Sequence, residues 1–177
     1  MADDLKSKLN ARAELERQQK EDAEKVELKY KAAVLREYPR LVNELYTRVK
    51  GALDGVKDVK ISMQTIKQTL TYSEGSTDTG IRQGAWGEVQ VPQWTVSFLD
   101  RKIAFTPSGT GFIGLHGKID MTMTRPNPLP HPGIFMFDAG DDPYTWKLGV
   151  VLDRNNPGAV ELTDKLLGDL LEQALLQ

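Results

Sequence analysis

The stretch IGLHGKIDMTM (residues 113–123) decides the fold class, because apolar and polar residues alternate along its whole length. The odd positions carry Ile, Leu, Gly, Ile, Met and Met, and the even positions carry Gly, His, Lys, Asp and Thr. A period of two residues predicts a β-strand with one face on a core and the other in water. Such strands are typical of antiparallel sheets.

Flanking stretches repeat this pattern. Residues 94–98 and 144–152 alternate, and residues 134–137 form a short apolar run. Residues 59–72 alternate with a change of phase, which predicts a bulge or a strand break near Gln64. No helical stretch separates these segments, so we expect an antiparallel meander of five or six strands.

Helices are predicted at both ends of the chain. Residues 3–37 contain no Gly or Pro and are rich in strong helix formers. Pro39 is expected to end this helix, to kink it or to open a second one. A broad apolar stripe then predicts helix over residues 39–54, and another over 159–176.

The predicted fold class is therefore α+β. A long N-terminal helix precedes a meander of five or six strands, which helices cover on one face, the C-terminal one included. We divide the chain into a charged helical extension, residues 1–36, and a single α+β domain, residues 37–177.

Composition excludes several classes of protein. The 177 residues include no cysteine, which removes disulfides and thiolate chemistry. No stretch has the length and apolarity of a membrane span or of a secretory signal, so we expect a cytoplasmic protein without a membrane partner. The net charge of −2 and the lack of a clustered basic face argue against nucleic acid as a partner.

Signatures of catalysis are weak. Residues 109–114 match the string GxGxxG, but a strand pattern follows where a nucleotide-binding helix is required. His116 and Asp120 share the polar face of the central strand, and His131 lies in the proline-rich run 125–133. These three are the candidate catalytic residues, although a solvated polar face has the same composition.

Three carboxylates are the candidate metal ligands: Asp138, Asp141 and Asp142. They crowd a Gly- and Pro-containing stretch that lacks the spacing of an EF-hand loop. Aspartates at such positions usually satisfy the backbone donors of a turn. A weak cation site is the alternative, and no cofactor is expected.

Protein contact is the best supported kind of function. The long helix has a thin apolar stripe with a polar gap over residues 16–22, so its coiled-coil signal is weak. It is either a solvated extension or a helix that dimerises or binds a partner. Trp86 is expected to be exposed in the Gly-rich loop 73–87. The candidate contact residues are Leu5, Leu9, Leu15, Val26, Tyr30 and Trp86.

We therefore expect a non-enzymatic interaction module, namely an adaptor, inhibitor or assembly protein. Its N-terminal helix would mediate self-association, as in a homodimer, or docking on another protein. The alternatives are a small metal-assisted hydrolase and a small-ligand-binding domain with the 73–87 loop as its lid.

Overall fold

The computed structural model describes residues 2–74, 82–109, 117–123, 134–137, 143–153 and 156–176. Along the chain, one helix precedes all the strands and a second helix follows them. The elements are α1 (Ala2–Ala52), β1 (Val59–Glu74), β2 (Arg82–Phe98), β3 (Arg101–Pro107), β4 (Gly117–Met123), β5 (Ile134–Phe137), β6 (Lys147–Asp153), β7 (Asn156–Glu161) and α2 (Asp164–Leu176).

The strands form one antiparallel meander in which each strand pairs with the next along the chain. This confirms the predicted α+β class. The described residues form seven strands, however, rather than five or six. The additional strand is β7, which includes Pro157 and Gly158. These are turn formers, and the predicted helix already began at Ala159, whereas α2 begins at Asp164.

The hairpin of β1 and β2 is longer than predicted. Its pairing runs from Val59 opposite Phe98 to Glu74 opposite Arg82. The register shifts between Leu70 and Thr71, which face Gly87 and Ala85, so Trp86 is the extra residue of a bulge. The bulge predicted near Gln64 is wrong, since pairing is regular there.

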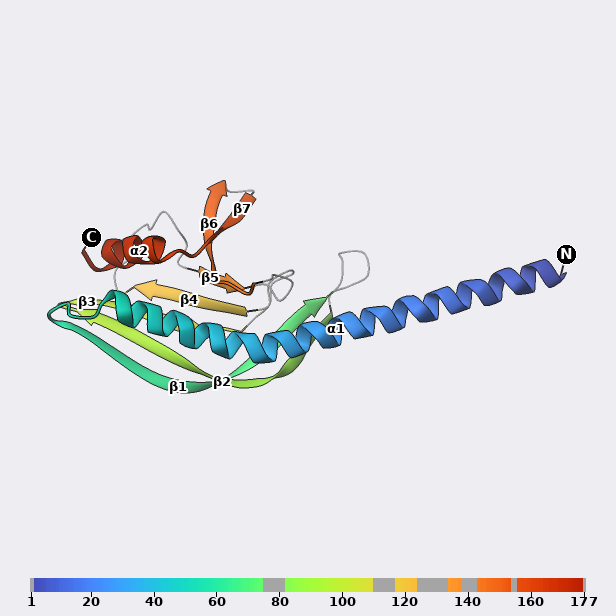
Figure 1. The fold of residues 1–177 in the computed structure, drawn as a ribbon, viewed down its shortest axis with the longest axis horizontal. Coiled ribbons are helices and arrows are strands. Elements are labelled where there is room, and N and C mark those ends of the chain that lie inside the picture. Colours follow the sequence, from blue (N-terminus) through green and yellow to red (C-terminus); the bar gives the residue numbers. More distant parts are fainter. Residues whose placement is uncertain are drawn as a thin grey trace.

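Helix α1 runs without interruption through Pro39. Proline has no N–H to donate to the carbonyl of Leu35, and its ring crowds that turn. Figure 1 shows that α1 changes direction between its blue and cyan parts, as a proline inside a helix commonly causes. Pro39 is therefore an internal residue of one helix of 51 residues rather than its end.

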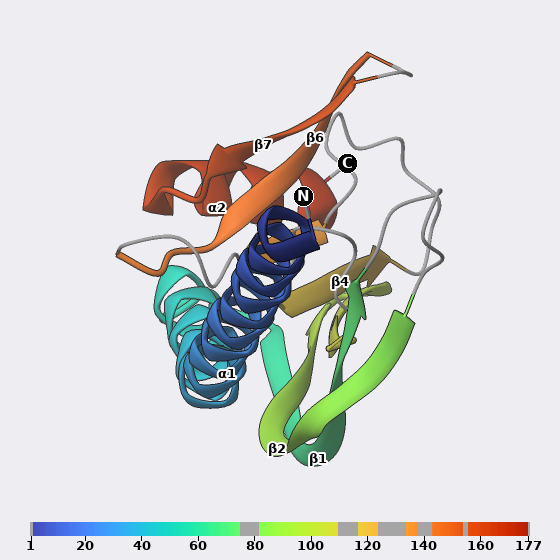
Figure 2. The same cartoon turned by 90° about the vertical axis from the view of Figure 1, so that its right-hand side faces the viewer.

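The sheet curls around the second half of α1, and α2 lies beside that half (Figures 1 and 2). Buried side chains from both helices and from the sheet form a single core. The largest fully buried ones are Trp94, Trp146, Tyr38, Phe105, Phe135, Leu41, Leu45, Leu70, Ile103, Ile119 and Leu148. No helix among the described residues is long and apolar enough to cross a membrane.

Long-range hydrogen bonds to backbone oxygens fasten α1 to the rest of the described fold. Tyr38 Oη donates to the backbone oxygen of Lys118 at 2.8 Å, and Trp146 Nε1 donates to that of Leu41 at 2.7 Å. Arg48 Nη2 donates to the oxygen of Leu162 at 2.9 Å, just before α2. Burial raises the pKa of Tyr38, so its hydroxyl stays protonated and keeps donating.

Candidate protein-interaction site

The first half of α1 projects beyond the sheet (Figure 1). Every residue from 6 to 26 is exposed, and we call these residues the projecting segment. Leu9, Leu15 and Val26 expose 59%, 57% and 49% of their surface there. Burial begins close to Tyr30, which packs partly against the core, and Ala33 and Val34 are core residues. The segment without tertiary contacts is thus shorter than the predicted extension 1–36.

Local interactions alone support the projecting segment. Arg12 and Glu16 pair at 3.1 Å, and Glu14 and Arg17 pair at 3.4 Å, all with exposed side chains. Each such pair contributes only about 0.2–0.5 kcal/mol. Most of the stability of helices in proteins comes from the packing of an apolar face, so packing against another chain would stabilise the segment.

Apolar residues of this segment lie on more than one face. Leu15 and Val26 are eleven residues apart, which leaves them about 20° apart around the helix axis at 3.6 residues per turn. Leu9 lies on a different face, between Lys6 and Arg12, which are three residues before and after it. Because the apolar residues do not form a continuous seam, a long coiled coil is not favoured.

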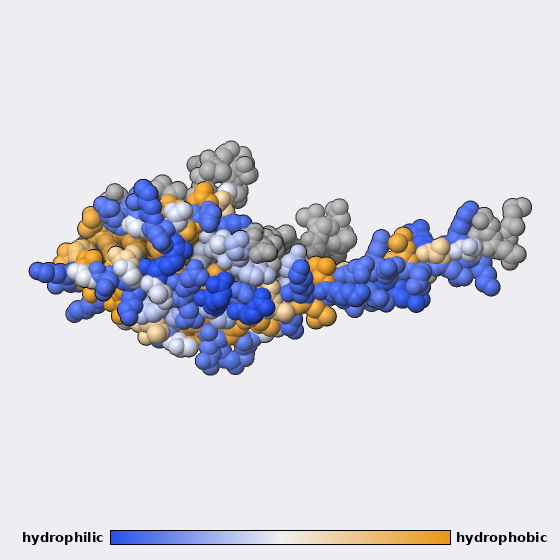
Figure 3. All heavy atoms as spheres, in the orientation of Figure 1, coloured by the Kyte–Doolittle hydropathy of each residue, from blue (hydrophilic) through white to orange (hydrophobic). Residues whose placement is uncertain are grey.

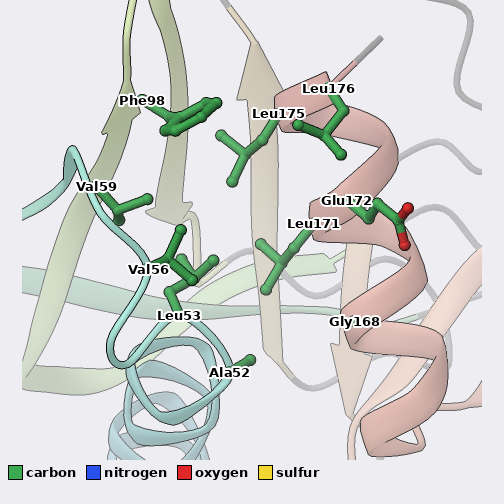
Figure 4. A pocket seen from close by; sticks show the side chains of 10 residues that line it. All are labelled: Ala52, Leu53, Val56, Val59, Phe98, Gly168, Leu171, Glu172, Leu175 and Leu176. Carbon is green, nitrogen blue, oxygen red and sulfur yellow. The ribbon is translucent and has the colours of Figure 1, made fainter.

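At the opposite end of the molecule lies an apolar pocket of about 210 Å³ (Figure 4), which we call the end pocket. Its walls come from the end of α1, the start of β1, the end of β2 and α2. The lining residues are Ala52, Leu53, Val56, Val59, Phe98, Gly168, Leu171, Glu172, Leu175 and Leu176. Figure 3 shows apolar atoms at the surface of this end of the molecule.

The size of the end pocket limits what fits in it. Small-molecule sites usually measure about 300–1,000 Å³, which is larger. An apolar cavity of about 150 Å³ is known to accommodate benzene. The end pocket therefore suits one or two apolar side chains rather than a drug-sized ligand.

One carboxylate edges the end pocket, since Glu172 is its one charged lining residue. The other carboxylates of α2 have partners of their own: Asp164 pairs with Arg48 at 2.8 Å, and Asp169 pairs with Lys165 at 2.6 Å. The last turn of α2 has no basic residue to complement the partial negative charge of a helix C-terminus. The carboxylate of Glu172 and the C-terminus of α2 would therefore attract a cationic side chain beside this pocket.

Of the three candidate catalytic residues, Asp120 alone is among the described residues. It is half-buried on β4, and its carboxylate pairs with Lys118 Nζ at 2.9 Å. His116 and His131 lie outside the described residues, as do the metal candidates Asp138, Asp141 and Asp142. In the described part of the chain, no three His, Asp or Glu side chains come together as a metal site would need.

Trp86 differs from its predicted setting. It lies within β2 rather than in a loop, and 7% of its surface is exposed. The bulge turns this side chain into the core, where it cannot contact a partner. Leu5 belongs to α1, but its side chain lies outside what the structure describes. The surface contact candidates are therefore Leu9, Leu15 and Val26.

The outer face of the sheet is polar, as the alternation predicts. Gln64 and Gln93 face each other across β1 and β2, with Nε2 and Oε1 at 3.4 Å. They border a polar depression of about 300 Å³ together with Ser62 and Thr95. The residues that line it include no charged group, so we see no acid–base chemistry there.

Among the described residues, Glu37 is the one charged residue whose side chain is buried. Its carboxylate accepts hydrogen bonds from Arg40 Nε at 2.7 Å and Arg36 Nε at 2.6 Å. These bonds hold the pKa of Glu37 below its ordinary value. Because both partners lie on the same helix, the cluster supports α1 rather than forming a catalytic site.

Comparison of the chain with models of known families, with curated proteins and with solved structures found no match. The function is therefore argued from the geometry alone. Sequence reasoning identified the exposed helix but missed the end pocket, because three separate parts of the chain build it. The sequence held one indication of this pocket, because Leu176 adds an apolar side chain at the edge of the apolar stripe of α2. In the structure Leu176 is 62% exposed and lines the pocket.

Proposed function

We propose that this protein is a non-enzymatic assembly protein, in which the projecting segment of α1 binds another copy of the same chain. The observation that carries the proposal is the exposure of Leu9, Leu15 and Val26 on a helix that continues directly from the core. The domain does not need this segment for its own core.

Rigid attachment supports this role. Beyond Tyr30 the same helix is buried and hydrogen-bonded to β4 and to the residue preceding β6. Because the projecting segment continues this anchored helix, the core sets the direction in which it leaves the domain. The arrangement favours a defined assembly over a flexible tether.

Hydrogen–deuterium exchange of the full chain tests the proposal at the level of residues. In dilute solution, amides of residues 6–26 should exchange fast, since only local hydrogen bonds protect them. At high concentration we expect these amides to become protected, while the amides of the buried residues Leu41, Leu45 and Val49 serve as the internal control. Equal exchange of residues 6–26 at both concentrations would contradict the proposal.

A further inference from the structure

The projecting segment, with its exposed Leu9, lies at the end of the molecule opposite to α2 and the end of α1 (Figure 1), the elements that help to line the apolar end pocket. We propose that the projecting segment and the end pocket bind each other between copies, so that the helix face around Leu9 of one copy docks in the end pocket of the next. This rests on the proposed function and names the surface that receives the helix.

Charge complementarity selects this occupant. Lys6 and Arg12 lie three residues before and after Leu9, and Lys8 is next to it; of these, Arg12 also pairs with Glu16 at 3.1 Å. On the receiving helix α2, Glu172 edges the pocket and the last turn carries no cation. A leucine flanked by bases therefore matches an apolar pocket edged by Glu172 and by a helix C-terminus.

Gly168 is a second observation that points to an occupant. It lies in the interior of α2, where glycine weakens a helix relative to alanine. A Cβ built at this position meets nothing within 4 Å, and Gly168 lines the end pocket. Packing thus does not require glycine here, and the effect of having no side chain is a wider pocket.

Docking must occur between copies rather than within one. The lining of the end pocket includes Ala52, the last residue of the same helix that carries Leu9. The 43 residue-to-residue steps from Leu9 to Ala52 span roughly 65 Å at about 1.5 Å per step. A copy cannot bring its own Leu9 to its own pocket while α1 stays helical.

The contact joins two different surfaces of the chain. Assembly therefore either continues as a chain of copies or closes into a ring, the smallest of which is a dimer in which each helix enters the other copy's pocket. Pairing of two projecting segments side by side would leave both pockets empty instead. The Gly168→Leu variant distinguishes the two arrangements, because only docking in the pocket depends on that position.

The test is a complementation experiment with two full-length variants. Leu9→Glu disables the helix, because a carboxylate would meet the acidic pocket edge. Gly168→Leu adds a side chain at the pocket wall, where a Cβ meets nothing within 4 Å, and alanine at the same position controls for helix propensity. Each variant alone should sediment as a monomer, with the dissociation constant raised roughly tenfold or more.

An equimolar mixture of the two variants should form a dimer and nothing larger, because one intact helix meets one intact pocket. Leu28→Glu, an exposed leucine elsewhere on α1, is the matched control and should assemble like the wild type. Circular dichroism confirms that each variant is folded.

Two outcomes overturn the inference and leave the proposed function standing: the Gly168→Leu variant assembles like the wild type, or the mixture stays monomeric while the wild type assembles. A wild type that is monomeric at every concentration contradicts the proposed function itself.

Discussion

Trp146 Nε1 donates a hydrogen bond of 2.7 Å to the backbone oxygen of Leu41. The same indole ring meets Tyr38 edge-on, with ring centroids 6.3 Å apart and planes at 68°. Trp146 thus contacts α1 on both sides of Pro39, where the proline removes one bond from the helix ladder. These contacts fix the direction in which the first half of α1 leaves the domain.

We predict that Trp146→Phe lowers the free energy of unfolding by about 1–3 kcal/mol. The substitution removes the hydrogen bond, worth about 1 kcal/mol, and leaves part of the indole volume empty. Urea unfolding followed by circular dichroism measures the change. An unchanged midpoint would show that this hydrogen bond does not anchor α1.

The start of α2 gives a second prediction. Thr163 Oγ1 accepts a hydrogen bond from the backbone N–H of Leu166 at 3.1 Å, the contact that an N-cap makes. Thr163→Ala should therefore cost about 1 kcal/mol in unfolding free energy. Thr163→Ser, which keeps the hydroxyl, is the control and should lie close to the wild type. Equal losses in both variants would argue against the cap.

Glu37 makes stability depend on pH in the acid range. Hydrogen bonds from Arg40 and Arg36 lower its pKa in the folded protein, below an ordinary value of 4.5. A lowered pKa contributes stability that is present above the unfolded value and is lost as pH falls through the folded value. We expect Glu37→Gln to lose about 1 kcal/mol at pH 7, because both arginines are largely in solvent.

The measurement for Glu37 is the unfolding free energy between pH 7 and pH 3. The difference between wild type and Glu37→Gln should shrink as pH falls below about 4.5. A difference that stays constant over this range would mean that the carboxylate charge is not what stabilises the helix.

Two glycines should respond in opposite ways to alanine. Gly168 lies within α2 with open space at its Cβ position, so Gly168→Ala should raise the unfolding free energy by about 0.5–1 kcal/mol. Gly55 also has open space, but its φ of 75° disfavours any side chain. Gly55→Ala should therefore be destabilising. Thermal unfolding of both variants checks the pair, and the same sign in both would contradict this account.

Strands whose two faces differ in polarity were predictable from the sequence, as in Gly117–Met123. Prediction failed where local signals conflict with tertiary contacts. The glycines around Trp86 indicate a loop, yet pairing with β1 extends β2 through them. Pro39 indicates a helix boundary, yet packing on the sheet keeps α1 continuous.

The candidate site was likewise predictable only in part. Exposure of Leu9 and Leu15 follows from a charged helix with a thin apolar stripe, so sequence alone pointed to them. The end pocket depends on how Val56, Phe98 and Leu175 come together from three parts of the chain. No pattern within a single element encodes that meeting.

The most direct test of the central claim is the mass of the full chain by light scattering over a concentration series. We predict that the mass rises above the 19.8 kDa of one chain as concentration increases. The triple variant Leu9→Lys/Leu15→Lys/Val26→Lys should stay at that value while remaining helical. A wild-type mass of 19.8 kDa at every concentration would contradict assembly through α1.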